Sequence, residues 1–270
     1  MNLIVSDGEV PYDKRFLAPG ISPDELETVA DPILLKHNIP VFRWDDRILL
    51  IDAGNGYCAT PYGGQLRSKL KAAGIAAEQV TDVVLTHAHP DHLGGLIDIH
   101  HRPAFPGAQV HISKMEHDFW QSKATDFSKS KNAKEELLEV QQQIQQMLEV
   151  VRAQLVFFDE TSTLPGFLRP IPAPGHTPGH TMFEVSAGDQ QFIHMADICH
   201  EESVLFNKPE WGTIFDIDFE LAAATRRNVL NDFANSGMLI LGYHMPYPGF
   251  GRVVRRGDGF AWAPEKAPDY

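Results

Sequence analysis

The sequence predicts an α/β fold with α+β character, in which two mixed β-sheets pack face to face and helices cover the outside. Short apolar runs typical of strands occur in both halves of the chain, and each strand-rich half ends in a helical pattern. Sheets and amphipathic helices bury their apolar surfaces most simply as packed layers. With 270 residues, of which 43% are hydrophobic and 22% charged, we expect one soluble domain over residues 1–270.

The first half is predicted to contain strands separated by short turns. The strand patterns are PILLKHNIPVFRW, RILLIDAGNG and VTDVVLTHAH, in that order. A helix is expected between the last two, over residues 65–73, because Leu66 and Leu70 share one face and Gly74 can adopt the left-handed cap. A short strand in AQVHIS and a helix beginning in KMEHDFW follow.

A longer helix is predicted from Ala133 to Leu155, where apolar residues recur every three or four positions between Glu and Gln. Together with KMEHDFW it forms a helical insertion at about residues 115–155. Periodicity leaves two interpretations open, a helix packed on the domain surface or one that walls or lids a pocket. The same helix could also provide the interface of a homodimer.

The second half repeats the strand pattern in QLVFFD, TMFEVS, QQFIHMAD and MLILGYH. A helix is expected over residues 219–235, before the last of these strands. Asp218 is a suitable N-cap for this helix, and Gly237 is a suitable stop.

Charge and composition limit the classes of partner. The chain has 23 Lys and Arg against 36 Asp and Glu, a net charge of −13, with no long basic patch, so nucleic acid is not an expected partner. The sequence contains no run of about 18 apolar residues, so it predicts no membrane-spanning helix. The start MNLIVSDGEVPYDKRF does not resemble a signal peptide. We therefore expect a cytoplasmic protein acting on a small molecule. The two cysteines, Cys58 and Cys199, predict neither a disulfide framework nor an all-cysteine zinc site.

The run THAHPDHLGG places four metal-binding side chains directly after an apolar strand: His87, His89, Asp91 and His92. Imidazole and carboxylate groups are common ligands of zinc and similar cations. One loop cannot complete two coordination spheres, so further ligands must come from other strand ends. Suitable side chains in such positions are His176, Asp197 and His244.

In this order, with Asp52 in LLIDAG ahead of them, these residues resemble the five motifs of the metallo-β-lactamase-fold hydrolase superfamily. The resemblance implies an αββα sandwich with a dinuclear metal site at one edge. It places His87, His89 and His176 on one metal, and Asp91, His92 and His244 on the other. Asp197 bridges them, and Asp52 orients a ligand from behind.

By that resemblance the cofactor is a pair of divalent ions, zinc first, with manganese, iron or cobalt as alternatives. Two such ions activate a hydroxide, which Asp91 or Asp197 would orient as catalytic residues. The tail GYHMPYPGFGRVVRRGDGFAWAP is similar to the N-acyl homoserine lactonase and methyl parathion hydrolase-like branch. One departure is that no tyrosine lies between Asp197 and Trp211, where lactonases of this type place one shortly after the bridging aspartate.

Two rival chemistries are disfavoured, because Asp197 stands where zinc β-lactamases of the commonest type carry cysteine and His89 stands where the oxygen-reducing branch carries glutamate. The expected substrate is a neutral ester or lactone, with phosphotriesters as a further class. A rival from another class is a catalytically weak, metal-bound scaffold that binds a partner or ligand through the 133–155 helix. Aromatic residues that could form an apolar substrate wall are Phe119, Trp120, Phe206, Trp211, Phe215 and Phe250.

The other histidines are expected to have lesser roles. Those close to the motifs could orient ligands: His180, His194 and His200. Those expected to make no metal contact are His37, His100, His101, His111 and His117.

Overall fold

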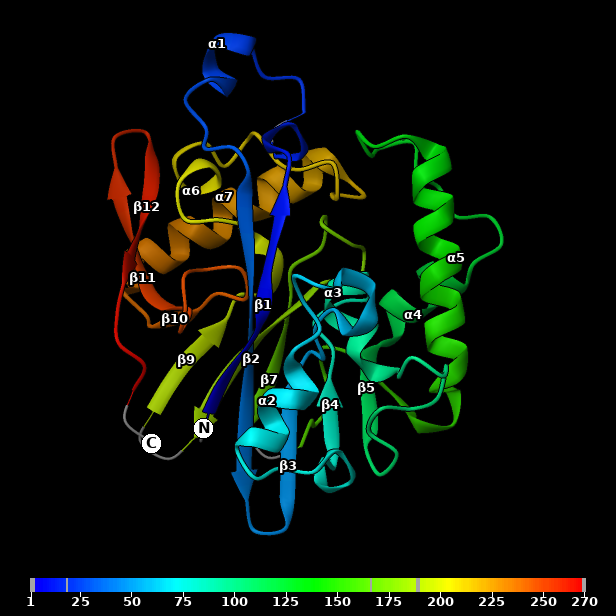
Figure 1. Cartoon of the computed structure of the whole chain (residues 1–270). Coiled ribbons are helices and arrows are strands. Elements are labelled where there is room, and N and C mark those ends of the chain that lie inside the picture. Colours follow the sequence, from blue (N-terminus) through cyan, green and yellow to red (C-terminus); the bar gives the residue numbers. More distant parts are fainter. Residues whose placement is uncertain (1–2, 18, 166, 188–189, 269–270) are drawn as a thin grey trace.

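The computed structural model describes residues 3–17, 19–165, 167–187 and 190–268, and it contains two stacked β-sheets (Figure 1). Each sheet has six strands within these described ranges. In order across the first sheet they are β1 (Leu3–Tyr12), β2 (Ile33–Trp44), β3 (Arg47–Ile51), β4 (Asp82–Val84), β5 (Gln109–Ser113) and β6 (Leu155–Phe158). Strands β1 to β3 pair antiparallel, whereas β3 to β6 pair parallel.

The second sheet is also mixed. Its strands, in order across the sheet, are β12 (Gly259–Pro264), β11 (Phe250–Arg256), β10 (Ile240–Leu241), β9 (Gln190–His194), β8 (Thr181–Ala187) and β7 (Leu168–Pro172). Strands β9 and β10 are parallel, and the other neighbours are antiparallel. The parallel pair brings two chain segments to the same sheet edge, which matters for the site below.

Helices lie on the outer faces of both sheets (Figure 1). Three separate apolar clusters fill the layers, one between the two sheets and one between each sheet and its helices. This arrangement confirms the predicted αββα sandwich. No helix in the described ranges combines the length and apolar character needed to cross a membrane. The helices are α1 (Pro23–Leu26), α2 (Leu66–Ala72), α3 (Pro90–Leu93), α4 (Lys114–Gln121), α5 (Lys134–Val150), α6 (Val204–Asn207) and α7 (Phe219–Ser236).

The two helices predicted with caps are confirmed. Helix α2 is followed by Gly74 with φ of 79°, and α7 ends at Gly237 with φ of 61°, both in the left-handed region that favours glycine. The Asp218 side chain accepts a hydrogen bond from the Leu221 backbone N–H at the start of α7. The short-range sequence pattern is sufficient here because capping is a local interaction.

Two boundaries in the middle of the chain were predicted wrongly. Helix α5 ends at Val150 rather than Leu155, because Leu155 pairs with Val110 and begins β6. Strand β6, in QLVFFD, does not belong with the second half but extends the first sheet in parallel to β5. The sequence pattern of a strand does not reveal which partner it pairs with.

The N-terminal strand β1 had no clear sequence signal, because its apolar pattern is interrupted by polar residues. Its pairing with β2 shifts register between Ser6 and Glu9, and Gly8 in this bulge has φ of 133°. A Cβ on Gly8 would lie 2.1 Å from the carbonyl oxygen of Tyr62, so only glycine fits. The strand then runs on to Tyr12, its last residue.

Asp82 links three strands of the first sheet, and we expect its contribution to stability to depend on pH. Burial opposes ionisation, but hydrogen bonds from His111, Arg47 and Thr81 outweigh it and lower the pKa of Asp82. Because the folded pKa is lowered, the stabilisation is present above pH 3.8, the ordinary aspartate pKa, and is lost as pH falls through the folded pKa.

The variant Asp82→Asn should therefore lower the free energy of unfolding at pH 7 by about 1–3 kcal/mol. The difference from wild type should shrink below pH 3.8. Urea unfolding of both metal-free proteins at pH 7 and pH 3 measures it. A gap that is equal at both pH values would contradict the assignment.

Candidate metal centre

Loops that follow strands in both sheets meet at one edge of the sandwich. His87 and His89 follow β4, and Pro90 opens α3 with His89 as its N-cap, so Asp91 and His92 project from the first helical turn. His176 lies in the loop between β7 and β8. Asp197 follows β9, and His244 follows its parallel neighbour β10. The structure thus brings together all seven predicted ligands.

The first group consists of three buried imidazoles: His87, His89 and His176. His89 Nδ1 lies 3.0 Å from His87 Nε2 and 2.9 Å from His176 Nε2. Burial, together with the neighbouring imidazoles, holds the pKa values of His87 and His89 well below the ordinary range. Both rings are therefore neutral, which is the form that binds a metal ion.

The second group consists of Asp91, His92, Asp197 and His244. The Asp91 Oδ2 atom lies 3.6 Å from His92 Nε2 and 3.5 Å from His244 Nε2. Burial alone would lower the pKa of His92, but the carboxylates of Asp197, Asp91 and Asp52 outweigh it and raise that pKa. The second group is thus rich in negative charge, which a cation would balance.

Asp197 touches both groups. Its Oδ1 lies 3.2 Å from His92 Nε2, and its Oδ2 lies 3.2 Å from His244 Nε2 and 3.4 Å from His176 Nε2. His92 Nε2 and Asp197 Oδ1 are buried but have no hydrogen-bond partner. Unpaired buried polar atoms are costly, and a cation between them would satisfy both. The donor set therefore fits two cations that share Asp197.

Three of the imidazoles are oriented by hydrogen bonds on the side away from the cluster. His92 Nδ1 donates to Asp52 Oδ2 at 2.8 Å, and His244 Nδ1 donates to the Lys36 carbonyl oxygen at 2.7 Å. His176 Nδ1 donates to Asp216 Oδ1, also at 2.8 Å. Each bond fixes the tautomer that leaves the Nε2 lone pair facing the other ligands.

Asp52 is held behind His92, where the sequence placed it. Its two oxygens accept hydrogen bonds from the Thr86 backbone N–H and hydroxyl, each at 2.8 Å. The Tyr243 ring stacks on His92 with 4.1 Å between centroids, and its hydroxyl donates to the Asp91 carbonyl oxygen. His92 is therefore fixed on its edge and on its face.

Asp216 is a functional residue that the sequence did not reveal. It is fully buried, and besides His176 it contacts the guanidinium of Arg226, at 3.1 Å. Burial opposes its ionisation, but Arg226 and His176 outweigh that effect and lower the pKa of Asp216. The only sequence signal was an isolated aspartate in FDIDFELA, two residues before the predicted N-cap of α7.

Three further histidines lie close to the two aspartates of the cluster, Asp91 and Asp197. The Asp197 backbone N–H donates to His180 Nε2 at 3.0 Å, so His180 holds the backbone of Asp197 in place. His200 Nε2 lies 3.3 Å from Asp197 Oδ2, and its ring stacks on His244. His37 was not expected near the metals, but its Nε2 lies 3.4 Å from Asp91 Oδ2.

Other histidines lie elsewhere in the fold. His111 bonds Asp82 in the first sheet, and His117 lies beside Asp118 on α4. His194 is buried in β9, where it accepts a hydrogen bond from the Ala196 backbone N–H. His100 and His101 are exposed.

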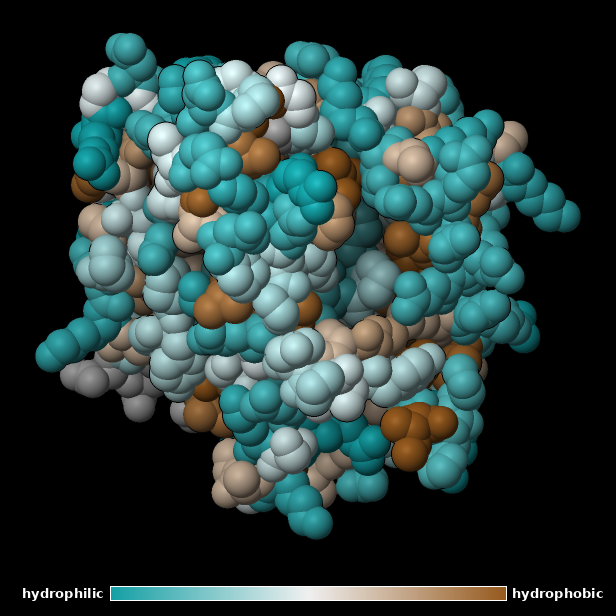
Figure 2. Space-filling model, turned by 45° about the horizontal axis from the view of Figure 1, so that its top comes forward, coloured by the Kyte–Doolittle hydropathy of each residue, from teal (hydrophilic) through white to brown (hydrophobic). Residues whose placement is uncertain are grey.

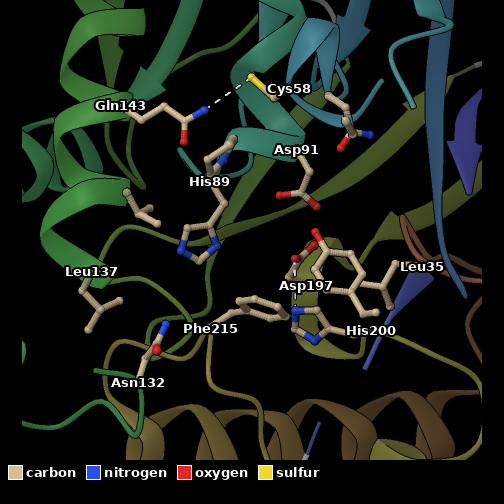
Figure 3. A pocket seen from close by; sticks show the side chains of 15 residues that line it. Leu35, Cys58, His89, Asp91, Asn132, Leu137, Gln143, Asp197, His200 and Phe215 are labelled. Atoms are coloured by element: carbon tan, nitrogen blue, oxygen red, sulfur yellow. Dashed lines mark hydrogen bonds and ion pairs between the residues drawn. The ribbon is translucent and has the colours of Figure 1, made fainter. Parts of the chain in front are cut away.

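A cavity of about 260 Å³ opens onto the cluster. In Figure 3, Asp91 points towards Asp197, while Leu137 on α5 and Leu35 on β2 face each other across the space. Gln143 on α5 donates a hydrogen bond to Cys58 Sγ at 3.4 Å, which connects α5 to the opposite wall. Figure 2 shows this hollow in a largely hydrophilic surface. The long helix is thus a cavity wall.

The prediction of an aromatic substrate wall was wrong for most of its residues, which do not line the cavity. Phe206 is fully buried against Trp262, and Phe250 packs against Phe192 between the sheets. Phe119 and Trp211 pack against the two outer apolar clusters. Hydropathy identifies these residues as apolar, but it does not distinguish the core from a cavity wall, because apolar side chains are favoured in both places.

Trp120 is buried beneath His89, with 5.8 Å between ring centroids, and does not line the cavity. Among the residues that the structure describes, Phe215 and Tyr12 do line it. Tyr12, which sequence reasoning missed, comes from the end of β1. Burial, with smaller contributions from Asp91 and Asp197, raises its pKa, so the hydroxyl remains a hydrogen-bond donor at neutral pH.

Two mixed sheets enclosed by helices, with a buried His and Asp cluster at one edge, define a class of metal-dependent hydrolases. The family model described as the Metallo-beta-lactamase superfamily matches residues 35–244. The chain therefore belongs to the metallo-β-lactamase superfamily, and the resemblance seen in its motifs is confirmed.

Solved structures with similar chains agree with this assignment. AidC, described as a dizinc quorum-quenching lactonase in complex with a product, is 33% identical, with a TM-score of 0.90 over 98% of this chain and 94% of its own. AbOPH, described as a hydrolase in the beta lactamase superfamily, is 27% identical, with a TM-score of 0.87 and the same two coverages. A relative known by its sequence, the uncharacterized protein YobT of Bacillus subtilis (strain 168), is 30% identical over 152 residues, which span 56% of this chain and 58% of YobT.

Proposed function

We propose that this protein hydrolyses neutral esters or lactones, with phosphotriesters as a further class of substrate. The observation that carries the proposal is a cavity lined by three of the seven ligands, His89, Asp91 and Asp197, whose described lining contains no lysine or arginine. A cation-free wall of apolar and amide side chains favours an uncharged organic molecule over an anion. The similarity to AidC, a lactonase, and to AbOPH, a hydrolase, supports the same reaction class.

In this proposal His87, His89 and His176 would hold one divalent ion, Asp91, His92 and His244 would hold the other, and Asp197 would contribute to both. Zinc is the first choice, with manganese, iron or cobalt as alternatives. When bound, such ions would lower the pKa of a water and polarise the bond under attack.

The chain's own residues would complete the reaction site. The carboxylates of Asp91 and Asp197 would accept hydrogen bonds from the attacking water and so orient it. Tyr12 lines the same cavity and keeps its proton, so its hydroxyl would donate to the oxygen that becomes negative in the transition state. In this way Tyr12, from the first strand, would take the place of the tyrosine missing after Asp197.

A substrate panel tests the proposal. Protein reconstituted with zinc, manganese or cobalt is assayed on lactones, uncharged aryl esters, a phosphotriester and a matched carboxylate-bearing ester. We expect turnover of the uncharged compounds, weak turnover of the anionic ester and loss of both after chelation. Activity that survives complete metal removal, or a preference for the anionic ester, would overturn it.

The cavity-facing side of α5 is expected to set the size of substrate accepted. Val140 lines the cavity, whereas Leu138 on the same helix is 46% exposed and points elsewhere. The variant Val140→Trp should raise KM for long-chain esters about tenfold and change KM for methyl or acetyl esters less than twofold, since lost volume penalises large substrates. The matched control Leu138→Trp should leave both values unchanged. Equal effects of the two variants would show that α5 does not set specificity.

The scaffold alternative would use α5 as a docking surface. The structure makes this less favourable, because Leu137, Ile144 and Met147 of α5 are buried in the first sheet's apolar cluster. Two bound metal ions with no turnover on the panel would favour it. A homodimer through α5 stays a prediction, and sedimentation equilibrium measures it.

A further inference from the structure

Glu116 on α4 is a fully buried carboxylate outside the ligand set, yet it is connected to it. Oε1 accepts hydrogen bonds from the Ala88 backbone N–H at 2.9 Å and from Trp120 Nε1 at 2.7 Å. Oε2 accepts from the Thr177 hydroxyl at 2.6 Å and from the Gly179 backbone N–H at 2.9 Å. Both oxygens are therefore fully occupied, and the side chain joins two loops separated by about ninety residues in the sequence.

The four partners of Glu116 surround one group of ligands. Ala88 lies between His87 and His89 in the sequence, and Thr177 directly follows His176. The indole of Trp120, which Glu116 fixes, packs edge-on against His89. Every member of the His87, His89 and His176 group is thus within one residue of a Glu116 contact or packs against one.

The second group is held by different residues. Asp52 and Tyr243 fix His92, and the Lys36 carbonyl oxygen fixes His244. None of these contacts involves Glu116. Glu116 thus supports the first group without touching the second. The two groups share Asp197 and the Thr86 hydroxyl, which lies 3.1 Å from His87 Nδ1 and also holds Asp52.

The surroundings of Glu116 require an acceptor at each oxygen. Three of its partners are N–H groups, which can only donate, and the fourth is a hydroxyl that rotates to donate. Burial raises the pKa of Glu116 and its four hydrogen bonds oppose that rise. An amide in place of the carboxylate would direct N–H groups at these donors, so even the isosteric Glu116→Gln change should disturb the contacts.

We propose that Glu116 is a positioning residue for the His87, His89 and His176 half of the centre as a whole, and that its substitution weakens this half without weakening the other. The proposal rests on the proposed function, because it assumes that the seven residues bind two metal ions. Partners behind the ligands of a metal typically change its affinity by about ten- to a hundredfold. Glu116→Gln should therefore weaken one of two zinc-binding events by that factor and leave the other within about twofold.

Zinc titration against a competing chelator, followed by elemental analysis, measures both binding events without any substrate. The half affected is identified by combining variants. In a His244→Ala background, only the first half remains intact, and adding Glu116→Gln should weaken the remaining ion about ten- to a hundredfold. In a His87→Ala background, adding Glu116→Gln should change the remaining ion less than twofold. Equal weakening of both ions, or effects of the same size in both backgrounds, would overturn the proposal.

A milder variant guards against a folding defect. Thr177→Val removes only one of the four donors and should weaken the same ion by a smaller factor, with circular dichroism unchanged. If Thr177→Val left both affinities unchanged while Glu116→Gln unfolded the protein, Glu116 would be a purely structural residue and the proposal would fail. If the wild-type protein bound two zinc ions but turned over no substrate, the proposed function would fail while this inference stood.

Discussion

Replacing Asp197 with asparagine is expected to lower kcat/KM by more than a thousandfold and to reduce the bound metal from two ions per chain to one or fewer. The carboxylate lies within 3.4 Å of the Nε2 atoms of His92, His176 and His244, so it is the predicted ligand that contacts both halves of the cluster. An amide keeps the size but loses the charge that offsets two dications. Loss of several kcal/mol of transition-state stabilisation corresponds to at least about three powers of ten in rate.

Elemental analysis and steady-state kinetics on the same preparation measure the two effects together. Asp82→Asn is the matched control, because it makes the same change at a buried aspartate in the first sheet, far along the chain from Asp197. The control should retain two ions and near-normal kcat. An Asp197→Asn protein with two tightly bound ions and normal turnover would show that Asp197 neither bridges metals nor orients water.

Asp216→Asn is expected to lower the free energy of unfolding by about 3–5 kcal/mol, the largest stability change we foresee. Arg226 is only 1% exposed and has Asp216 as its anionic partner at 3.1 Å, so the variant leaves a buried guanidinium with carbonyl groups alone. The same change removes the charged acceptor behind His176, which should weaken metal binding about ten- to a hundredfold.

Glu210→Gln is the matched control, because it removes the acidic partner of Arg227, the residue next to Arg226 on α7. Glu210 and Arg227 pair on the surface, where both side chains are 50% exposed. Such exposed pairs contribute at most about 1 kcal/mol. Urea unfolding with and without zinc separates the two effects of Asp216→Asn. If it destabilised the protein no more than Glu210→Gln does, the buried ion pair would not be a major source of stability.

The fold was largely predictable because its determinants are local and repeated. Apolar runs, helix caps and the order of ligand motifs each depend on a few neighbouring residues, as Asp218 and Gly237 at the ends of α7 illustrate. Strand pairing was not predictable, because β6 joins the first sheet through a register with β5 that neither segment encodes alone. Strand β1 was missed because its bulge at Gly8 breaks the alternation of apolar and polar residues.

The candidate site shows the same division. Its ligands belong to residue types and spacings that are rare by chance, so the sequence identifies them. Glu116, Asp216 and Tyr12 are single residues of common types, and their roles follow only from what packs against them. The predicted aromatic wall failed for a different reason. Phe206 and Phe250 are buried in the core, and an apolar residue fits the core as well as it fits a cavity wall.

The ligands come from both halves of the sandwich, with His87 to His92 following a strand of the first sheet and His176, Asp197 and His244 following strands of the second. A bound metal pair would therefore act as a clamp between the two sheets. Metal ions that bind only the folded protein raise its free energy of unfolding by mass action. The resistance of the protein to unfolding would therefore depend on the supply of metal. In a cell short of metal, the protein would lose its catalytic activity and, at the same time, the link that stabilises the packing of its two sheets.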